Sequence, residues 1–550
     1  MSYLSGNVPG TLEQWEKEEG RYINQSLSAL THSRKMAILL SVGLVTAIEI
    51  SNRISVNVLL PDMQGNVAAS SDEISWVVIL YNLGFLCSLA LSTWMTRVIG
   101  ARRHLLYSIA LYSIGAFGCF LSERSLNSLL IARLVMGFGG GAFLVRAVIL
   151  AGLMFPGNAR INAVTWLYGV LFVFQTTYPL GMGWITDQIH WNYAFLIDFP
   201  FLALGAFLIW KFIPPGYLFR RKAGAKVDVR GAALLIVSLV CLQVATSRGE
   251  RDLWLESFWI APALLAALMC FIAFLWWDSQ PQNTDPVFHL HMIWRQPAVR
   301  TSFGVVMIVG AILGAGLFVV PQYLRTVQEY SATQTGGFIS MYTSGLGVGL
   351  VLSLRFLLPR IGGPRTLGLG LLLLCVTCAS IIYIWTPTTP TSILVPAIFL
   401  QGFSLAPTLL GASNVATANT PLPDLNDIST TYFFVRQLGN TFGVTAATIL
   451  FDHRMTLHSS RLLDVANRVD PLVRRTLTGY AAVIHRNGGA GSNPALGALQ
   501  IFQADVVTQS KLLSYIDIYF GLAVLAAVGL FLLAITRIKN KITRNHFHPW

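Results

Sequence analysis

An acidic and a basic residue stand close together inside one long apolar run of the sequence. Glu49 and Arg53 are four residues apart in the run that begins near Met36. If this run is a helix, their side chains lie on one face, one turn apart. A charge at the centre of a bilayer costs roughly 3 kcal/mol, so such residues are usually functional. We therefore interpret Glu49 as a proton-carrying carboxylate; the alternative is a static ion pair that fixes helix packing.

Two further ionisable residues extend this candidate proton-coupling set. Arg133 enters its own apolar run from the opposite side, so we expect it to reach a depth similar to that of Arg53. Asp198 lies near the start of another run, where it either caps a helix or joins the network. The predicted proton-coupling residues are therefore Glu49, Arg53, Arg133 and Asp198.

Membrane-spanning helices must hold these residues. The 550 residues are 54% hydrophobic and 11% charged, whereas soluble domains carry roughly 25% charged residues. A helix needs about 20 apolar residues to cross a bilayer. Apolar runs begin near Met36, Ile74, Leu105, Leu126, Ala163, Ala194, Ala232, Phe258, Phe303, Phe338, Leu367, Ile393, Thr431 and Leu512. The sequence thus predicts an all-α integral membrane protein with about fourteen spans.

The Lys and Arg residues predict how these spans are oriented. If the N-terminus is cytoplasmic, most of the basic residues between the runs fall on the cytoplasmic side, and the short outer loops keep only Arg124, Arg248, Arg251 and Arg325. Cytoplasmic loops are generally enriched in Lys and Arg, so we expect both termini to be cytoplasmic. The same bias explains the formal net charge of +13. No nucleic-acid partner is expected, since the basic residues do not gather on a soluble face.

Three features that suggest other chemistry have simpler explanations. All six cysteines lie in apolar runs, which favours buried thiols over disulfides or a metal site. The sequence contains no GxxxxGK[ST] motif, so it has no P-loop for ATP. The glycine-rich stretch from Gly137 to Gly141 lies inside an apolar run and predicts close helix packing rather than a nucleotide site. We therefore expect no enzymatic activity and no metal or other cofactor, with a proton gradient as the energy source.

Several segments, in combination and in order, carry a family resemblance. Residues 184–200 read WITDQIHWNYAFLIDFP, Pro179 and Gly183 fit part of a GPxxGG pattern, and Arg133 begins RLVMGFGGG. Residues 320–337 read VPQYLRTVQEYSATQTGG, and residues 436–439 read RQLG. Together they resemble the fourteen-helix drug:proton antiporter branch of the major facilitator superfamily, the EmrB/QacA type. The resemblance covers nearly the whole chain from Met36 to Lys539.

An internal repeat fits the architecture that this resemblance implies. WMTRVIGARR, from Trp94, and FLLPRIGGPR, from Phe356, each end a span and enter a basic inner loop, and both resemble the superfamily's loop GxLaDrxGrR. The expected fold is two six-helix bundles with two inserted transmembrane helices. Conformational roles in these motifs are predicted for Gly100, Arg102, Pro179, Gly183, Gly362 and Arg365.

This architecture divides the chain into five parts. We expect a cytoplasmic extension (1–35), an N-terminal six-helix bundle (36–213), an inserted helix pair with flanking cytoplasmic loops (214–297), a C-terminal six-helix bundle (298–537) and a cytoplasmic tail (538–550). The C-terminal bundle includes a polar periplasmic loop, 452–511, in which a two-helix hairpin is expected.

The chain departs from the family's pattern at positions that bear on coupling. Arg97 and Pro359 stand where the two copies of the loop motif normally have an acid. Asn52 stands at the acid of the first-helix pattern LDxTixNvxLP, and Tyr178 and Met182 replace two glycines of GPxxGG. The coupling residues of the family therefore cannot be transferred directly to this chain.

Polar and aromatic residues within the runs supply a candidate substrate cavity. The predicted lining residues are Asn52, Asn57, Tyr178, Phe174, Arg436, Gln437 and Asn440. For Arg436, Gln437 and Asn440, polar contacts that join helices are favoured over direct binding of the substrate. Because Arg53 and Arg133 flank a single deep acid, we expect neutral or anionic lipophiles to be preferred over cations.

The function implied by the resemblance is proton-coupled export of lipophilic compounds, that is, multidrug efflux, across a bacterial inner membrane. The alternatives are a dedicated exporter of one metabolite, such as a siderophore or a fatty acid, and a transport-incompetent receptor or scaffold. The expected partners are a small lipophilic substrate and membrane lipid. The resemblance adds a periplasmic adaptor protein and an outer-membrane channel, for which residues 452–511 are the expected contact.

Overall fold

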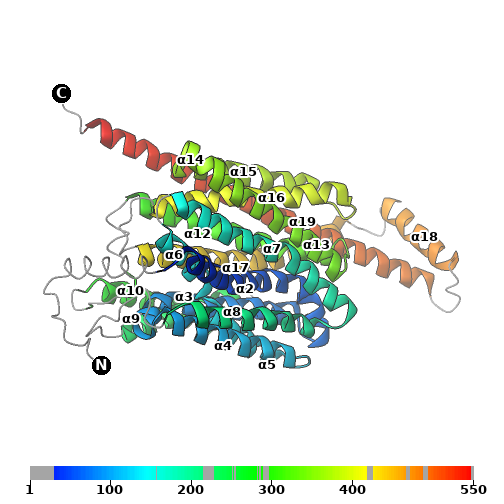
Figure 1. The fold of residues 1–550 in the computed structure, drawn as a ribbon. Helices are drawn as coiled ribbons and strands as arrows, with labels where there is room; N and C mark the ends of the chain where they lie inside the picture. Colours follow the sequence, from blue (N-terminus) through cyan, green and yellow to red (C-terminus); the bar gives the residue numbers. More distant parts are fainter. Residues whose placement is uncertain are drawn as a thin grey trace, which may run out of the picture.

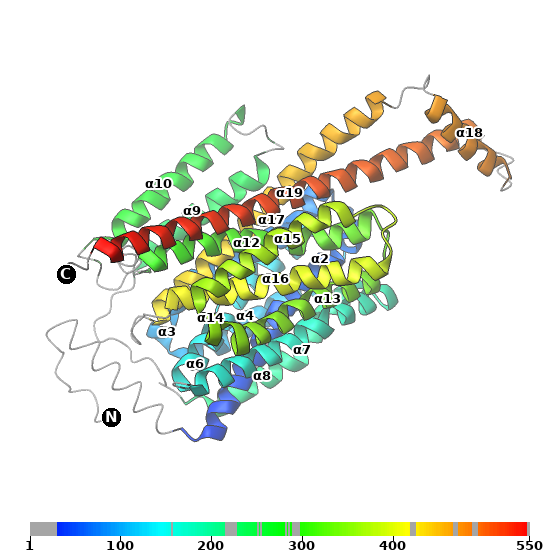
Figure 2. The ribbon, with the colours of Figure 1, turned by 90° about the horizontal axis from the view of Figure 1, so that it is seen from above.

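Long helices that lie side by side build the protein, as Figures 1 and 2 show. The computed structural model describes residues 30–155, 158–214, 228–249, 252, 256–280, 283, 287–288, 297–417, 425–465, 471–486 and 493–546. Within these ranges every regular element is helical. The all-α prediction is therefore confirmed.

The first half of the chain forms one bundle. Its helices are α2 (His32–Asn66), α3 (Ser71–Ile99), α4 (Ala101–Leu121), α5 (Leu126–Gly140), α6 (Phe143–Met154), α7 (Asn158–Gln188), the 3-10 helix η1 (Trp191–Ile197) and α8 (Asp198–Phe212). α5 and α6 are two parts of one apolar segment. α2 packs against α7 and α8, and α5 packs against α3 and α4.

The last part of the chain forms a second bundle. It contains α12 (Pro297–Thr326), α13 (Ala332–Leu352), the π-helix η3 (Ser353–Leu357), α14 (Leu358–Ile361), α15 (Gly363–Ile384), α16 (Thr391–Thr417), α17 (Leu425–Val465) and α19 (Pro494–His546). α12 packs along α17, α16 contacts both α13 and α15, and α19 contacts α12, α15 and α17. Large apolar side chains such as Leu372, Phe520 and Phe531 are exposed on the outside, as lipid-facing helices require.

Between the bundles in sequence lies a helix pair, α9 (Val229–Arg248) and α10 (Ile260–Asp278). The two helices pack on each other, and α9 also contacts α3 of one bundle and α17 of the other. Gln243 Nε2 donates a hydrogen bond to Thr445 Oγ1 at 3.2 Å, which fixes α9 on α17. The pair therefore sits on the outside of the seam where the two bundles meet.

The bundles contact each other mainly through α7 with α13, α3 with α17 and α2 with α12. Near the end of α2, Asp62 Oδ2 forms an ion pair with Arg325 Nη2 at 2.7 Å. Near the end of α7, Asp187 Oδ2 accepts hydrogen bonds from the backbone N–H of Thr333 at 2.8 Å and from its hydroxyl at 2.5 Å. Two acids of the N-terminal bundle thus hold the C-terminal bundle at this end of the molecule.

Twelve helical segments of the described residues are long and apolar enough to cross a membrane. The expected number was about fourteen, and the difference lies in α7 and α17, which are not among the twelve. Both helices carry polar residues in their middle, such as Gln175 in α7 and Arg436 in α17. α7 and α17 nevertheless pack lengthwise within the bundles, against α2 and α13 and against α12.

The internal repeat has the same backbone shape in both copies. Gly100 joins α3 to α4 with φ 85° and ψ 151°, and Gly362 joins α14 to α15 with φ 76° and ψ 165°. Side chains make this region of backbone space essentially inaccessible to residues other than glycine. The two sharp turns are equivalent positions in two halves of related construction.

The predicted outer segment, residues 452–511, is largely helical among its described residues. α17 continues to Val465, α18 (Pro471–Arg486) follows, and α19 begins at Pro494. α18 packs on α19, where the Tyr480 hydroxyl donates to Asp505 Oδ2 at 2.5 Å. Most of the predicted turn between them, residues 487–492, lies outside the described residues.

The ends of the described chain also have a clear placement. Figures 1 and 2 show the start of α2 and the end of α19 at one end of the bundles, and α18 projecting from the opposite end. α19 runs without a break through residues 538–546, where a tail was expected. Residues 1–29 of the predicted extension, and residues 215–227 of the predicted loop before α9, lie outside the described residues.

Candidate functional site

Glu49 lies in the middle of α2 and has no exposed surface. The Tyr81 hydroxyl, from α3, donates to Glu49 Oε1 at 2.8 Å, and Arg53 Nε lies 3.2 Å from the same oxygen. The predicted pairing of Glu49 with Arg53 one turn away is therefore present. Glu49 Oε2 is buried without a hydrogen-bond partner among the described residues. A buried carboxylate with a bare oxygen is costly while it is charged, so this group is chemically suited to gaining a proton.

The glycine-rich stretch makes room for this carboxylate. A Cβ added at Gly140 would lie 3.0 Å from Glu49 Cγ and 3.0 Å from the Tyr81 hydroxyl oxygen. A Cβ added at Gly137 would collide with the backbone oxygen of Tyr81. Glycine at these positions therefore allows α5 to approach α2 and α3 closely. The structure agrees with the sequence interpretation of this stretch as a packing surface.

Asp198 forms a second buried carboxylate cluster. It is the first residue of α8 and has no exposed surface. Its oxygens accept hydrogen bonds from the Tyr178 hydroxyl, from Asn52 Nδ2 at 2.9 Å and from the Tyr112 hydroxyl at 3.5 Å. Of the two roles that the sequence left open, helix cap or network member, the structure has Asp198 in the network.

Asn52 connects Asp198 to Arg133. Arg133 Nη1 donates to Asn52 Oδ1 at 3.4 Å, and the guanidinium lies over the Tyr81 ring, 4.3 Å from its centroid. The Arg133 side chain is almost fully buried. A side-chain amide suits this place because it accepts from a cation on one side and donates to a carboxylate on the other. Asn52, at the position where the family usually has an acid, thus forms a polar bridge between Arg133 and Asp198.

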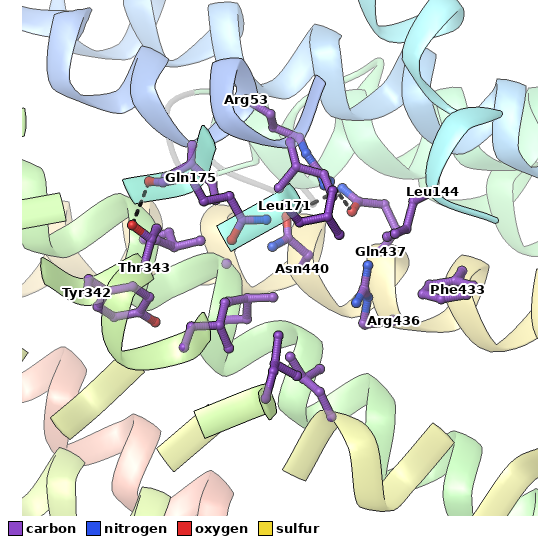
Figure 3. A pocket seen from close by; sticks show the side chains of 18 of the residues that line it. Arg53, Leu144, Leu171, Gln175, Tyr342, Thr343, Phe433, Arg436, Gln437 and Asn440 are labelled. Atoms are coloured by element: carbon purple, nitrogen blue, oxygen red, sulfur yellow. Dashed lines mark hydrogen bonds between the residues drawn. The ribbon is translucent and has the colours of Figure 1, made fainter. Parts of the chain in front are cut away.

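A cavity lies between the two bundles, and the space there that protein atoms do not fill, open solvent included, is about 1260 Å³ (Figure 3). Helices α2, α3, α6 and α7 line one side, and α12, α13, α16 and α17 line the other. Much of the wall is aliphatic, with Leu171, Leu313, Leu317, Leu346, Leu409 and Leu410. Two arginines, Arg53 and Arg436, also line it, and no Asp or Glu is among its lining residues in the described part of the chain.

Arg53 links Glu49 to this cavity and to the other bundle. Its Nη1 donates to Gln437 Oε1, on α17, at 2.7 Å, a bond drawn in Figure 3. Gln437 Nε2 in turn donates to Asn82 Oδ1, on α3, at 3.2 Å. The carboxylate, the guanidinium and the cavity amide therefore form one continuous chain of polar contacts across the seam between the bundles.

Arg436 projects from α17 into the cavity (Figure 3). Its guanidinium carbon lies 4.9 Å from the centroid of the Phe433 ring. It forms no hydrogen bond or ion pair with any residue in the described ranges. Of the three residues for which polar contacts between helices were the alternative, Gln437 makes such contacts, with Arg53 and Asn82, and Arg436 makes none in the described ranges.

Four of the seven predicted cavity residues line the cavity, namely Asn57, Arg436, Gln437 and Asn440. The prediction is wrong for Asn52, Tyr178 and Phe174. Asn52 and Tyr178 turn into the N-terminal bundle to bind Asp198, and Phe174 packs edge-on against Phe201 at 5.1 Å between ring centroids. These residues are on cavity-forming helices, but the rotation of each helix points their side chains elsewhere.

Pro179 and Gly183 lie where α7 crosses α13. A Cβ added at Gly183 would collide with the backbone oxygen of Ala332, and one added at Gly336 would collide with the backbone oxygen of Pro179. The remnant of the GPxxGG signature is therefore a contact surface between the bundles, where backbone approaches backbone. Any larger side chain there would separate the two helices.

The basic residues after the two sharp turns differ in their surroundings. Arg102, two residues after Gly100, has its guanidinium carbon 5.7 Å from the centroid of the Trp210 ring on α8. Arg365, after Gly362, is exposed. In the repeat Arg365 is equivalent to Arg103, which is also exposed, and Pro364 stands at the position of Arg102.

Sequence reasoning missed several residues of the site. Tyr81 and Tyr112 are hydrogen-bond partners of the two buried acids. Asn82 and Gln175 line the cavity, and Gln175 accepts through its backbone oxygen from the Thr343 hydroxyl at 2.6 Å. The adjacent polar pair Tyr81 and Asn82 inside the apolar run of α3 was an available signal. Aromatic residues are so frequent in membrane helices that neither tyrosine stood out.

Two helical bundles, a cavity between them and buried ionisable groups beside it define a polytopic membrane transporter. A family model described as Major Facilitator Superfamily matches residues 42–444. The chain therefore belongs to the Major Facilitator Superfamily.

Relatives in the drug:proton antiporter branch support the resemblance seen in the sequence. The chain is 24% identical over 442 residues to the multidrug export protein EmrB of Haemophilus influenzae, covering 79% of this chain and 84% of that protein. It is 22% identical over 504 residues to the fatty acid resistance protein FarB of Neisseria gonorrhoeae, covering 89% of this chain and 94% of that protein. The predicted membership of this branch is confirmed.

Solved structures show the same fold. A peptide transporter POT in complex with sulfate has a TM-score of 0.61 at 14% identity, covering 94% of this chain and 98% of that one. A bacterial homolog of the human lysosomal transporter Spinster, in an inward-facing and unoccupied conformation, has a TM-score of 0.56 at 15% identity, covering 92% and 98%. At these identities the likeness establishes the fold alone.

Proposed function

We propose that the protein is a proton-coupled secondary transporter that exports lipophilic compounds across a bacterial inner membrane. It works by alternating access between the two bundles, with the proton gradient as energy source and no other cofactor. It spans the membrane about fourteen times, with α7 and α17 as the two additional spans and both termini in the cytoplasm. The start of α2 and the end of α19 lie at the same end of the bundles, which supports placing both termini on one side of the membrane.

The observation that carries the proposal is the position of Arg53 between Glu49 and Gln437. Arg53 lies 3.2 Å from the acid and donates at 2.7 Å to the cavity amide of the other bundle. A proton on Glu49 removes the negative charge that holds Arg53, so the guanidinium is free to change its bond to Gln437. Proton occupancy and the geometry of the cavity wall therefore depend on one side chain.

A second candidate is dedicated export of fatty acids. The similarity to a fatty acid resistance protein over 89% of this chain favours it. The aliphatic wall of the cavity suits an alkyl chain as well as a flat drug molecule. A binding panel on the purified protein separates the candidates: one tight ligand favours dedicated export, and many weaker ligands favour multidrug efflux.

Export to the cell exterior would also require partners. By analogy with the EmrB-type relatives, we propose a periplasmic adaptor protein and an outer-membrane channel. The projecting α18, on the side opposite the ends of the described chain, is the surface on which an adaptor would dock.

Proton coupling is tested in everted membrane vesicles with an acridine dye that reports the pH gradient. The probes are 4-(pyren-1-yl)butanamide and pyrene-1-sulfonate, which carry no titratable proton at neutral pH. Substrate-dependent loss of the gradient is expected with the wild-type protein and not with Glu49→Gln. Glu123→Gln, at an exposed loop position, is the matched control and keeps the response. A Glu49→Gln protein that still dissipates the gradient, or a wild-type protein that responds to neither probe, contradicts the proposal.

A further inference from the structure

Of the two arginines that line the cavity, only Arg53 makes a direct ion pair with an acid in the described part of the chain. Arg53 pairs with Glu49 and donates to Gln437. Arg436 has the Phe433 ring as its aromatic neighbour and no hydrogen-bonding or ionic partner in the described part of the chain. The third predicted cation, Arg133, does not line the cavity and is bound to Asn52. Arg436 is therefore the cavity-lining cation that has no direct contact with an acid among the described residues.

A guanidinium in this setting is incompletely satisfied. It presents five N–H donors in a planar fork, and in the interior such donors normally meet carboxylates, carbonyls or water. Arg436 is half-buried, and its donors are open to the cavity, so an incoming anion would form charge-assisted hydrogen bonds with them. The bidentate geometry of arginine matches a carboxylate, a sulfonate or a phosphate in particular.

A second cavity residue also lacks a partner. The Tyr342 hydroxyl, on α13, is buried and has no hydrogen-bond partner among the described residues. It lines the same cavity, and Figure 3 shows it on the side of the cavity away from Phe433. The hydroxyl oxygen itself is closed off from the cavity, near Gly316 of α12, so it is the ring of Tyr342 that forms part of the cavity wall.

We propose that Arg436 is the binding site for the anionic group of the substrate. This inference rests on the proposed transport function and names its substrate class: an organic anion with an apolar body, such as a long-chain carboxylate. The anionic group lies on the Arg436 guanidinium beside Asn440, and the apolar body lies along Leu313, Leu317 and Leu346. The ring of Tyr342 is part of the same cavity wall.

The charge balance of the cavity explains why this site selects against cations. An organic cation needs a carboxylate or an open aromatic face to offset its lost hydration. The cavity wall has no acid in the described residues, and Glu49 is held by Arg53. A cation would therefore depend on aromatic rings of the wall, such as Tyr168 and Phe172, in a cavity that also holds two guanidinium groups. The sequence led us to expect that Arg53 or Arg133 selects the charge of the substrate. In this proposal Arg436 has that role.

The test is equilibrium binding to the purified full-length protein in lipid nanodiscs without any proton gradient. Three probes share one body and differ in charge: 4-(pyren-1-yl)butanoate, its neutral amide and the corresponding trimethylammonium derivative. Wild-type protein should bind the carboxylate most tightly. Arg436→Gln should weaken carboxylate binding roughly 10- to 100-fold and amide binding far less, because one charge-assisted hydrogen bond is lost. Arg436→Lys should keep a preference for the carboxylate.

Arg360→Gln is the matched control, since Arg360 is exposed at the end of α14 and does not line the cavity. Binding of the amide by Arg436→Gln shows that the variant is folded. The proposal is overturned if Arg436→Gln keeps the carboxylate-to-amide preference of the wild type, or if the wild type prefers the trimethylammonium probe. Because no gradient is present, this result is independent of whether transport is coupled to protons.

Discussion

Replacing Asp62 by Asn should shift the protein towards a conformation in which the bundles separate at the end of α2. Asp62 and Arg325 form an ion pair at 2.7 Å between α2 and α12, and the two side chains are 30% and 13% exposed. Arg325 Nη1 also donates to the backbone oxygen of Tyr330 at 3.1 Å, a bond within its own bundle that the substitution leaves in place. The change therefore removes the negative charge from a contact that exists only while the bundles are together, and leaves an amide oxygen that can accept only a weaker hydrogen bond from Arg325.

The size of the effect follows from the geometry. Two unit charges about 3 Å apart at an effective dielectric of 20 attract by roughly 5–6 kcal/mol, which is an upper limit before desolvation is counted. Hydrogen bonds to charged groups contribute roughly 1.5–3 kcal/mol in proteins. The equilibrium between closed and separated forms should therefore move roughly 10- to 150-fold.

Pulsed electron paramagnetic resonance can measure this shift. Spin labels at Gly65→Cys, where added atoms meet open space, and at the exposed Tyr383→Cys report the distance between the bundles at this end. The six natural cysteines are replaced in this background. Asp62→Asn should increase the long-distance population, and the reversed pair Asp62→Arg with Arg325→Asp should restore the short one.

A control separates this effect from general loosening. Asp517 accepts from His458 at 2.8 Å, a contact made between α17 and α19 of the same bundle. Asp517→Asn should leave the distance distribution unchanged. If Asp62→Asn leaves the distribution unchanged as well, or if both substitutions shift it equally, the ion pair does not hold the bundles together.

Two further predictions concern the glycine contact and the projecting segment. Gly140→Ala should lower the free energy of unfolding by roughly 1–3 kcal/mol and reduce proton-coupled transport, because its Cβ would press on Glu49. The control is Gly169→Ala, whose Cβ would meet nothing within 4 Å, and it should change neither unfolding nor transport. A variant that lacks residues 488–494 should lose several-fold more export from intact cells than transport in proteoliposomes; equal loss in both would indicate a gate rather than an adaptor surface.

Much of the fold was predictable because apolar length is a local property of the sequence. The predicted run starting near Leu126 coincides with the start of α5, and the runs near Ile74 and Ile393 begin within three residues of α3 and α16. The repeat was also readable, since a glycine that must take φ near 80° occurs at the same place in both copies. The polar middles of α7 and α17 could be interpreted only with their packing partners, because hydropathy alone does not register a helix that faces a cavity.

The site was predictable only where its residues share one helix. Glu49 and Arg53 are an i, i+4 pair, so helical geometry alone brings them together. The contact of Asp198 with Asn52 joins residues 146 positions apart in the chain, and no local pattern encodes it. The cavity prediction failed at Tyr178 and Phe174 for the same reason. Composition identifies which segment is a membrane helix, but tertiary packing determines which face of that helix lines the cavity.

The two buried acids occupy different electrical settings, and the proposed mechanism uses that difference. The direct donors to Asp198, Tyr178 and Asn52, are neutral, and the nearby cation Arg133 lies behind Asn52 in the same bundle. Glu49 shares Arg53 with Gln437 of the other bundle. A change of protonation at Asp198 therefore acts on contacts inside the N-terminal bundle, whereas the same change at Glu49 acts on a contact between bundles. Alternating access is a relative movement of the bundles, so in our proposal Glu49 is the acid whose proton is coupled to that movement.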